Sequence, residues 1–365
     1  MGATNHNAVL AFSHNTHANN RLQVRVAPSA DAPNTALYSS LGAVPQNEGP
    51  AIGFENSCEM TQEEAAAIVT LKKGTPKEKI INAYGLYTIL VTLVLNPIWS
   101  AAMAITDAVC NTFPDLDPHR SVYDTTGKIW AKAWLSAANS YPSISGDIER
   151  LKKDNDLGAC LFVANHASWL DIPVLCTVLD PVFKFIAKGE LKEVPCIGQQ
   201  LTGGNHIMID REDRRSQLRT FKEGVSWLNN GVPLMAFPEG MRSNDGRLME
   251  FKGGIFSMAV KANVPIVPIS ISNTHAVMPG FSLFPIQTGS GKLHVHVHDP
   301  IHADGKKEAE LAELVREKLL SRMPLEQHPL PKIVDEEFEE EIPTPIPDAD
   351  AKDPHKEQLQ KVNYT

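Results

Sequence analysis

The stretch CLFVANHASWLDIPVLCTVL, residues 160–179, joins two patterns of different kinds. Its first five residues form a short apolar run typical of a buried strand, and the residues from Trp169 onward have the composition of a helix. Pro173 is tolerated only in a first helical turn, so the helix is expected to begin near residues 168–171. The stretch therefore predicts a strand, a short polar turn and a helix.

His166 and Asp171 lie five positions apart at this junction. Within one regular helix they would be separated by about 140° of rotation and about 7.5 Å of rise, too far for contact. They can meet when His166 lies in the turn and Asp171 in the first helical turn. Two interpretations are open here: a histidine base held by a carboxylate, or a helix-capping aspartate beside a surface histidine.

Further strands and helices alternate along the rest of the chain. Strands are predicted at VPLMAF (232–237), VPIVPISI (264–271) and KLHVHVHDPI (292–301). Two helices are predicted to face the core with the apolar sets Leu218, Phe221, Val225, Leu228 and Leu311, Leu314, Val315, Leu319. The alternation predicts an α/β fold over residues 150–323, with a layered, mostly parallel sheet flanked by helices.

Charge is concentrated at the C-terminus. The whole chain carries a net charge of −9, and residues 324–365 hold 11 acidic and 4 basic side chains, or −7 of that total. This tail is predicted to be disordered. The remainder is close to neutral, which argues against nucleic acid as a partner.

The first 60 residues lack helical or strand periodicity and carry Arg21 and Arg25 before their first acid, Asp31. An acid-poor start with arginine and serine is typical of an organelle transit peptide, and a plain disordered segment is the alternative. The five cysteines show no CxxC pair and no zinc spacing. Reduced thiols in a protein facing the cytosol or a plastid stroma are the expectation.

Residues 80–106 form a run without a charged side chain. This run is long enough to cross a bilayer. Asn96–Pro97 interrupts this run, and lysines precede it while aspartates follow it. A clean span would place the later domain on the far side of the membrane. We therefore expect residues 80–140 to be membrane-associating helices that are broken, re-entrant or interfacial, with Trp130 and Trp134 at the lipid surface.

Polar residues gather where the predicted strands end. Strand 232–237 runs into PEGMRS, which supplies Glu239, Gly240 and Arg242 at the sheet edge where α/β proteins bind ligands. An arginine fork suits a phosphate group. Arg211 follows another apolar run, and residues 184–222 hold eight basic side chains against five acidic ones. This bias favours a phosphate-bearing substrate.

Three histidines alternate with valines in HVHVH, residues 294–298. Such a row can bind zinc. The alternative is a strand whose valines face the core and whose histidines face water. Since no fourth ligand lies nearby, no metal site is predicted.

The blocks NHASWLD, IDRED, FPEGMRS and VPIVPI, in this order and spacing, resemble the glycerolipid acyltransferase family, which includes the 1-acylglycerol-3-phosphate (lysophosphatidate) acyltransferases. The resemblance covers roughly residues 157–285. It implies that His166 is a general base and Asp171 its support. Binding of the glycerol phosphate is implied for Lys188, Arg211, Phe237, Pro238, Glu239, Gly240 and Arg242. Met241 stands where the family most often has threonine, which would loosen positioning of the acceptor.

The resemblance implies a membrane enzyme that moves a fatty acyl group from acyl-CoA or acyl carrier protein to the sn-2 hydroxyl of 1-acylglycerol 3-phosphate, giving phosphatidic acid. No cofactor is expected. The site would face the cytosol or stroma, at the endoplasmic reticulum or plastid envelope. Alternatives are a glycerol 3-phosphate or lysophospholipid acceptor, or a catalytically silent membrane adaptor. Because no GxSxG motif is present, an acyl-serine intermediate is not indicated.

Overall fold

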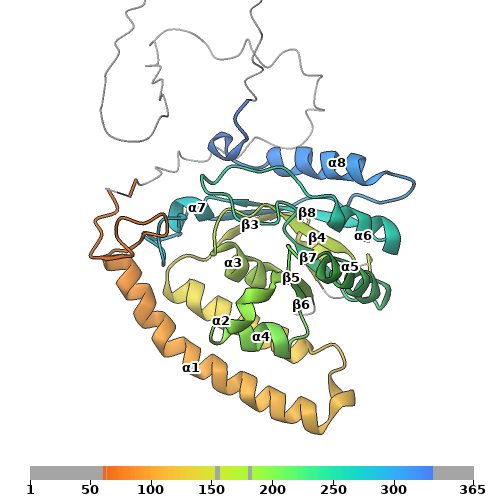
Figure 1. Ribbon diagram of the computed structural model, residues 1–365, viewed down its shortest axis with the longest axis horizontal. Helices are drawn as coiled ribbons and strands as arrows, with labels where there is room; N and C mark the ends of the chain where they lie inside the picture. Colours follow the sequence, from red (N-terminus) through yellow and green to blue (C-terminus); the bar gives the residue numbers. More distant parts are fainter. Residues whose placement is uncertain (1–60, 63, 153–156, 180–182, 332–365) are drawn as a thin grey trace, which may run out of the picture. The chain divides into compact units, whose positions relative to one another are not determined.

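The computed structural model describes residues 61–62, 64–152, 157–179 and 183–331 (Figure 1). The segment 1–60 and the acidic residues 332–365 lie outside these ranges. The strands are β1 Val69–Leu71, β2 Lys79–Ile81, β3 Ser143–Gly146, β4 Leu161–Ala164, β5 Lys184–Lys188, β6 Ile207–Ile209, β7 Leu234–Ala236, β8 Ile266–Ser272 and β9 His294–Val297. The α-helices are α1 Ala83–Thr112, α2 Ser121–Ala137, α3 Asp171–Val178, α4 Ile197–Gly203, α5 Arg214–Asn229, α6 Gly254–Ala262, α7 Thr274–Val277 and α8 Glu308–Leu320.

The central sheet has the order β3-β9-β8-β4-β7-β5-β6 within the described residues. Strands β8, β4, β7, β5 and β6 run parallel to one another, and β9 is antiparallel to β8 but parallel to β3. All seven residues of β8 are buried, as expected for a central strand covered on both faces. The prediction of a layered α/β fold with a mostly parallel sheet is confirmed.

Helices cover both faces of this sheet. Alternate residues of β4 supply the two cores: Phe162 packs with the side chains of α2 and α3, and Leu161 packs with those of α5, α6 and α8. The predicted core face of α8 is buried at Leu311, Val315 and Leu319. Leu218 differs from its prediction. It is 55% exposed, since α5 turns Gly224 and Leu228 toward the sheet.

The long apolar segment forms α1, a single curved helix of 30 residues (Figure 1). Asn82 caps it by accepting the Gly85 N–H at 2.9 Å. The expected break at Pro97 is absent. A proline removes one backbone donor and bends a helix without ending it when packing holds both halves, and here α2 packs along α1.

The tryptophans of α2 contact α1. Trp134 Nε1 donates to Thr92 Oγ1 at 2.9 Å, and Trp130 Nε1 donates to Asn96 Oδ1 at 3.1 Å while its ring stacks on Trp99. Trp134 is buried against α1, whereas Trp130 is partly exposed, so a place at a lipid surface stays a prediction for Trp130.

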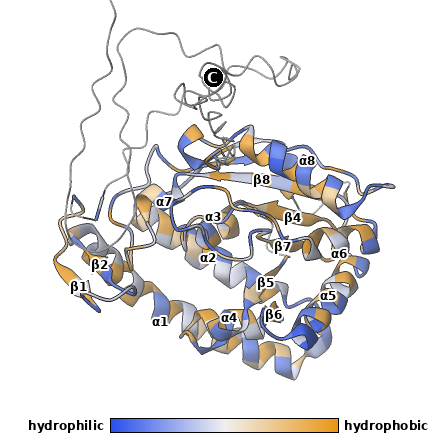
Figure 2. Cartoon of the chain, turned by 45° about the horizontal axis from the view of Figure 1, so that its top comes forward, coloured by the Kyte–Doolittle hydropathy of each residue, from blue (hydrophilic) through white to orange (hydrophobic). Residues whose placement is uncertain are grey.

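The outer side of α1 remains apolar and exposed, and Figure 2 shows hydrophobic residues along this helix. Its most exposed apolar side chains, each more than 60% exposed, are Leu90, Leu93, Val94, Ile98 and Ile105. Among the described residues, α1 is the one helix long and apolar enough to cross a membrane.

A buried ion pair ties α2 to the sheet. Lys184, at the start of β5, is fully buried, and its Nζ donates to Asp124 Oδ2 of α2 at 2.8 Å and to the Gly204 carbonyl at 2.7 Å. His206 Nε2 lies 3.2 Å from the other oxygen of Asp124. Removing one partner of such a pair costs about 3–5 kcal/mol, so α2 is firmly held on the sheet.

The folded chain continues past the boundary predicted at residue 324. Residues Leu325–Gln327 form a 3-10 helix. Gln327 is buried, its Oε1 accepts the Asn273 N–H at 3.1 Å, and its carbonyl accepts the Leu248 N–H at 2.9 Å. The predicted start of the tail was therefore too early.

Candidate active site

The turn between β4 and α3 places His166 against Asp171. The helix begins at Asp171, so the carboxylate lies in the first turn and the imidazole in the loop before it. His166 Nδ1 and Asp171 Oδ2 are 2.7 Å apart. A carboxylate can only accept, so Nδ1 carries the hydrogen and Nε2 keeps its lone pair. The contact expected from the sequence is present.

Asp171 is fully buried and receives three further hydrogen bonds. Its Oδ2 also accepts the N–H groups of Ala167 at 2.8 Å and Ser168 at 2.9 Å. Its Oδ1 accepts the hydroxyl of Thr274, the first residue of α7. Four donors therefore fix the carboxylate and, through it, the plane of the imidazole. The helix-capping interpretation is wrong, because Leu170 occupies the cap position and Asp171 accepts from N–H groups that precede the helix. Support of a histidine base by Asp171 stays a prediction.

The residues after β7 support His166 from another direction. The ring of Phe237 stacks on the imidazole at a centroid distance of 3.9 Å and an angle of 12°. Glu239 is buried, and its two oxygens accept the backbone N–H groups of His166 at 2.6 Å and Met249 at 2.8 Å. Burial raises the pKa of Glu239 to about 8. Both residues thus position the histidine, while direct contact of either with glycerol phosphate stays a prediction.

Pro238 and Gly240 shape the same loop. Pro238 is buried, and its carbonyl accepts the Lys252 N–H at 2.9 Å. Gly240 has φ +74°, in the left-handed region that favours glycine, and a Cβ there would lie 3.0 Å from the side chain of Lys252. The glycine therefore leaves room for a lysine that the sequence did not single out.

Arg242 lies close to the histidine turn. Its guanidinium sits over the ring of Trp169, 4.7 Å from the centroid. The next residue, Ser243, donates its N–H to the carbonyl of His166 at 2.9 Å. Burial lowers the pKa of Arg242, and the negative charge of Asp171 opposes that shift. The structure therefore brings Arg242 together with His166, as a phosphate-binding role requires.

Lys188 and Arg211 lie further along the same sheet edge. Lys188 ends β5, is exposed, and pairs with Glu190 at 2.8 Å. Arg211 follows β6, the strand at the end of the sheet, and its side chain is exposed. No direct contact joins either cation to His166 in the described part of the chain. Their part in binding substrate remains a prediction.

Two of the three alternating histidines, His294 in β9 and His298 directly after it, do not face water, whereas His296 is partly exposed. His294 and His298 are buried, and serines bind their rings: His294 Nδ1 lies 2.8 Å from Ser143 Oγ, and His298 Nε2 lies 2.8 Å from Ser270 Oγ. The valines do face the core, as the alternative interpretation held. The histidines are covered because β3 and α8 pack around this strand, and no group that could hold a metal is found among the described residues.

Several site residues were missed from the sequence. Thr274 follows β8 at the carboxyl edge of the sheet, so the rule that found Glu239 and Arg242 could have found it too. Trp169 lies within the quoted stretch but offered no chemical signal. Lys79 lies far upstream of the sheet, and nothing local in the sequence predicts that its ammonium bonds to the carbonyl of Gly280, in the loop after α7.

Comparison with known proteins supports the resemblance. Residues 146–272 match a family model described as Acyltransferase. A chloroplastic 1-acyl-sn-glycerol-3-phosphate acyltransferase of Brassica napus is 36% identical over 202 residues, 53% of this chain and 55% of that protein. A 1-acyl-sn-glycerol-3-phosphate acyltransferase of Saccharomyces cerevisiae is 32% identical over 170 residues, 45% of this chain and 55% of that protein.

A solved structure shares the fold. The crystal structure of the 1-acyl-sn-glycerophosphate acyltransferase from Thermotoga maritima matches with a TM-score of 0.54 and 27% identity, over 65% of this chain and 94% of that chain. The chain spans about half the length of the curated relatives it matches. The part of the chain that is similar to these acyltransferases, residues 146–272 in the family match, therefore includes the histidine turn and the arginine loop.

Proposed function

We propose that this protein transfers a fatty acyl group from a thioester, acyl-CoA or acyl carrier protein, to the free sn-2 hydroxyl of 1-acylglycerol 3-phosphate, forming phosphatidic acid. The observation that carries this proposal is the His166–Asp171 contact at 2.7 Å beside the guanidinium of Arg242. Names of the relatives supply the acceptor, since several are 1-acyl-sn-glycerol-3-phosphate acyltransferases.

The reaction needs a base and a phosphate anchor. An alcohol attacks a thioester slowly unless a base removes its proton in the transition state. Nε2 of His166 has no hydrogen-bond partner among the described residues, so it is open to accept the hydroxyl proton. The alcohol oxygen then bonds to the thioester carbon, the carbon–sulfur bond breaks, and the proton passes from the imidazolium to the thiolate. Asp171 stabilises that imidazolium.

The acceptor phosphate is assigned to the cations beside the histidine. A phosphate on Arg242 would hold the neighbouring glycerol hydroxyl near Nε2. Lys188 and Arg211 complete the proposed set from the far strands, and Phe237, Pro238, Glu239 and Gly240 shape the loop. Most of the proposed lowering of the activation free energy comes from orientation, because a bound hydroxyl held beside the thioester reacts as if the two were parts of one molecule.

The lipid substrates are proposed to reach the site from a bilayer. The exposed apolar side of α1 is large for a water-facing surface, and such patches mark membrane or protein contacts. Relatives named chloroplastic and the acid-poor N-terminal sequence favour the plastid envelope, with a stromal active site, over the endoplasmic reticulum. Imaging of a fluorescent fusion distinguishes the two compartments.

The experiment that tests the function is an acyl-transfer assay on the purified full chain in lipid nanodiscs. Acceptors are 1-acylglycerol 3-phosphate, glycerol 3-phosphate and lysophosphatidylcholine, each with acyl-CoA and acyl carrier protein donors. We expect His166→Ala to remain folded and to lose about 10²–10⁴-fold in kcat. His302→Ala, at an exposed histidine, is the control. Full activity of His166→Ala, or wild-type protein inactive on every acceptor, would refute the proposal.

A further inference from the structure

The β1–β2 hairpin, which precedes α1, is docked on the loop after α7. The N–H of Ile80 donates to the Phe281 carbonyl at 3.0 Å, and the Leu283 N–H donates to the Ile80 carbonyl at 3.2 Å. Ile80 is 1% exposed and packs with Ile286. Asn82 Nδ2 adds a bond to the Ile286 carbonyl at 2.7 Å. The hairpin is thus fixed to the catalytic domain although about 200 residues separate the two segments.

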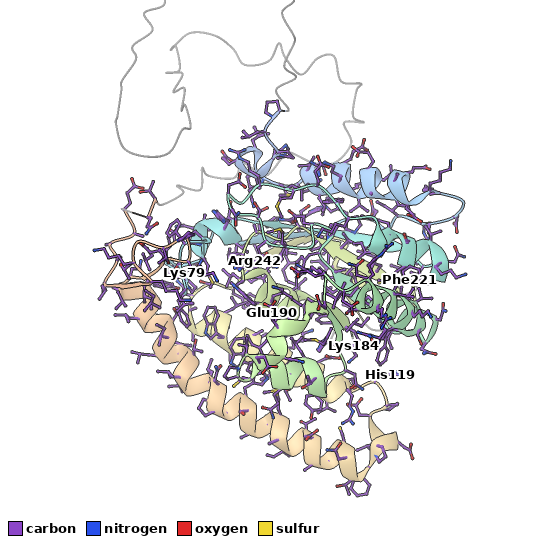
Figure 3. All side chains as sticks on the ribbon, in the orientation of Figure 1. Lys79, His119, Lys184, Glu190, Phe221 and Arg242 are labelled. Atoms are coloured by element: carbon purple, nitrogen blue, oxygen red, sulfur yellow. The ribbon has the colours of Figure 1, made fainter. Side chains whose placement is uncertain are left out.

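This docking brings the ammonium of Lys79 to the active-site loops (Figure 3). Lys79 Nζ donates to the carbonyl of Gly280. The loop that contains Gly280 lies beside both the histidine turn and the arginine loop. In the histidine turn, the Ser168 hydroxyl donates to the Met278 carbonyl at 2.7 Å. In the arginine loop, the Asn244 carbonyl would lie 3.9 Å from a Cβ on Gly280. Lys79 is therefore anchored between the histidine turn and the arginine loop.

The charges of Lys79 and Arg242 interact here, and Asp171, whose charge also acts on Arg242, forms no ion pair with either cation. In the part of the chain that the structure describes, no carboxylate lies within 4.0 Å of the charged nitrogens of Lys79 or Arg242. Burial and the nearby positive charge of Arg242 lower the pKa of Lys79. Both side chains are partly buried. Holding like charges together in a partly desolvated place is unfavourable unless an anion binds there.

We propose that Lys79 and Arg242 together bind the phosphate monoester of the acyl acceptor, and that Lys79 makes the site select this dianionic group. The inference rests on the proposed function and names the residue that sets its acceptor class. A phosphate monoester carries about −1.5 to −2 charges at neutral pH, whereas a phosphodiester headgroup carries one and a monoacylglycerol none. A second cation therefore favours the monoester most. Lys79 lies outside residues 146–272, so the family domain alone does not supply it.

The thioester donor could bring phosphate to the same place, since acyl-CoA and the carrier's phosphopantetheine both contain it. The kinetic experiment separates the sources by titrating acceptor and donor independently, with Lys79→Met as the test variant. Lys79→Gln keeps a donor for the Gly280 carbonyl but removes the charge, and Lys79→Arg restores the charge. Lys77→Met, an exposed lysine of the same hairpin, is the matched control.

We expect Lys79→Met and Lys79→Gln to raise KM for 1-acylglycerol 3-phosphate by about 10–100-fold, as for loss of one charge-assisted contact. We expect kcat and KM for the thioester to stay within about threefold. Lys79→Arg should recover most of the loss, and Lys77→Met should match the wild type. An unchanged acceptor KM, or a rise confined to the thioester KM, would overturn the inference.

A binding measurement keeps this test separate from the proposed function. Calorimetry with glycerol 3-phosphate on the His166→Ala protein reports phosphate binding without turnover, and Lys79→Gln in that background should weaken it by a similar factor. Wild-type protein that binds glycerol 3-phosphate through Lys79 but transfers no acyl group would refute the function and keep the phosphate site. Equal binding with and without Lys79 would refute the site.

Discussion

The hydroxyl of Thr274 and the carboxylate of Asp171 are joined by a hydrogen bond between two segments 103 residues apart. Asp171 Oδ1 accepts from Thr274 while Oδ2 accepts from His166. The end of β8 therefore reaches the catalytic turn through a single hydroxyl. No contact joins Thr274 to His166 in the described part of the chain, so its proposed role is to position Asp171, the proposed support of the base.

Replacement of Thr274 by valine removes this hydroxyl without changing the size of the side chain. Three donors would still hold the carboxylate, so we expect a fall of about 5–20-fold in kcat, corresponding to about 1–2 kcal/mol. KM for the acceptor should change by less than about twofold. Steady-state kinetics of Thr274→Val and Thr274→Ser check this: serine should restore most of kcat, and an equal loss with serine would contradict the hydrogen-bond role.

Replacement of Glu239 by glutamine should damage the catalytic turn. Each of the two carboxyl oxygens of Glu239 accepts a backbone N–H group, whereas a carboxamide has one oxygen and would turn its NH₂ toward the other donor. We expect a loss of about 1–3 kcal/mol in unfolding free energy and at least about tenfold in kcat. Thermal unfolding and kinetics measure both. Glu223→Gln, on the exposed side of α5, is the control and should leave both unchanged.

Stability should depend on pH through His298. Burial lowers the pKa of this histidine to about 3, well under its ordinary value near 6.5. Between these values the unfolded chain takes up a proton that the folded chain does not, so the unfolding free energy falls as pH drops below about 6.5. At pH 5 the loss reaches about 2 kcal/mol relative to neutral pH.

The comparison variant is His298→Gln, which keeps a donor for Ser270 but does not titrate. Denaturant unfolding at pH 7.5 and pH 5 should show the wild-type advantage over the variant shrinking by up to about 2 kcal/mol. The subtraction removes the contribution of Glu239, whose raised pKa acts with the opposite sign. A constant difference between the two proteins across this range would contradict a neutral buried His298.

The outer side of α1 should govern membrane binding. Each of Leu90, Leu93, Val94 and Ile98 is more than 60% exposed, and burial of one such side chain in lipid contributes about 1.5–3 kcal/mol. Changing all four to serine should lower partitioning onto liposomes by more than about 100-fold, with the circular dichroism spectrum retained. Leu218→Ser on α5 is the control. Unaltered flotation with liposomes of the fourfold variant would rule out this surface as the contact.

Contacts between residues close in the sequence could be predicted, whereas contacts between residues far apart in the sequence could not. His166 and Asp171 are close in the chain, and Pro173 fixed the helix start, so their contact could be predicted. The partners of Thr274 and Lys79 are about 100 and 200 residues away, and no short pattern encodes such pairings. The stacking of Trp130 on Trp99 was not predicted either, because an aromatic ring suits a helix–helix contact as well as a lipid surface.

The histidines of β9 show a second limit. Strict alternation predicts that one face of a strand is apolar, and Val295 and Val297 are buried accordingly. It does not say what covers the other face. Only the pairing of β3 with β9, which brings Ser143 beside His294, and the packing of α8 decide that the imidazoles are enclosed.

The enclosed salt link between Lys184 and Asp124 means that α2, and with it α1, cannot swing as a tether. A domain on a flexible linker samples many distances from a lipid surface. In the proposed membrane-bound state, the sheet of this protein would keep one distance and one tilt. In that state, the lipid acceptor would have to rise from its leaflet to reach His166. The rigid packing of α1 and α2 on the sheet, rather than the length of a linker, would set how far the lipid has to move.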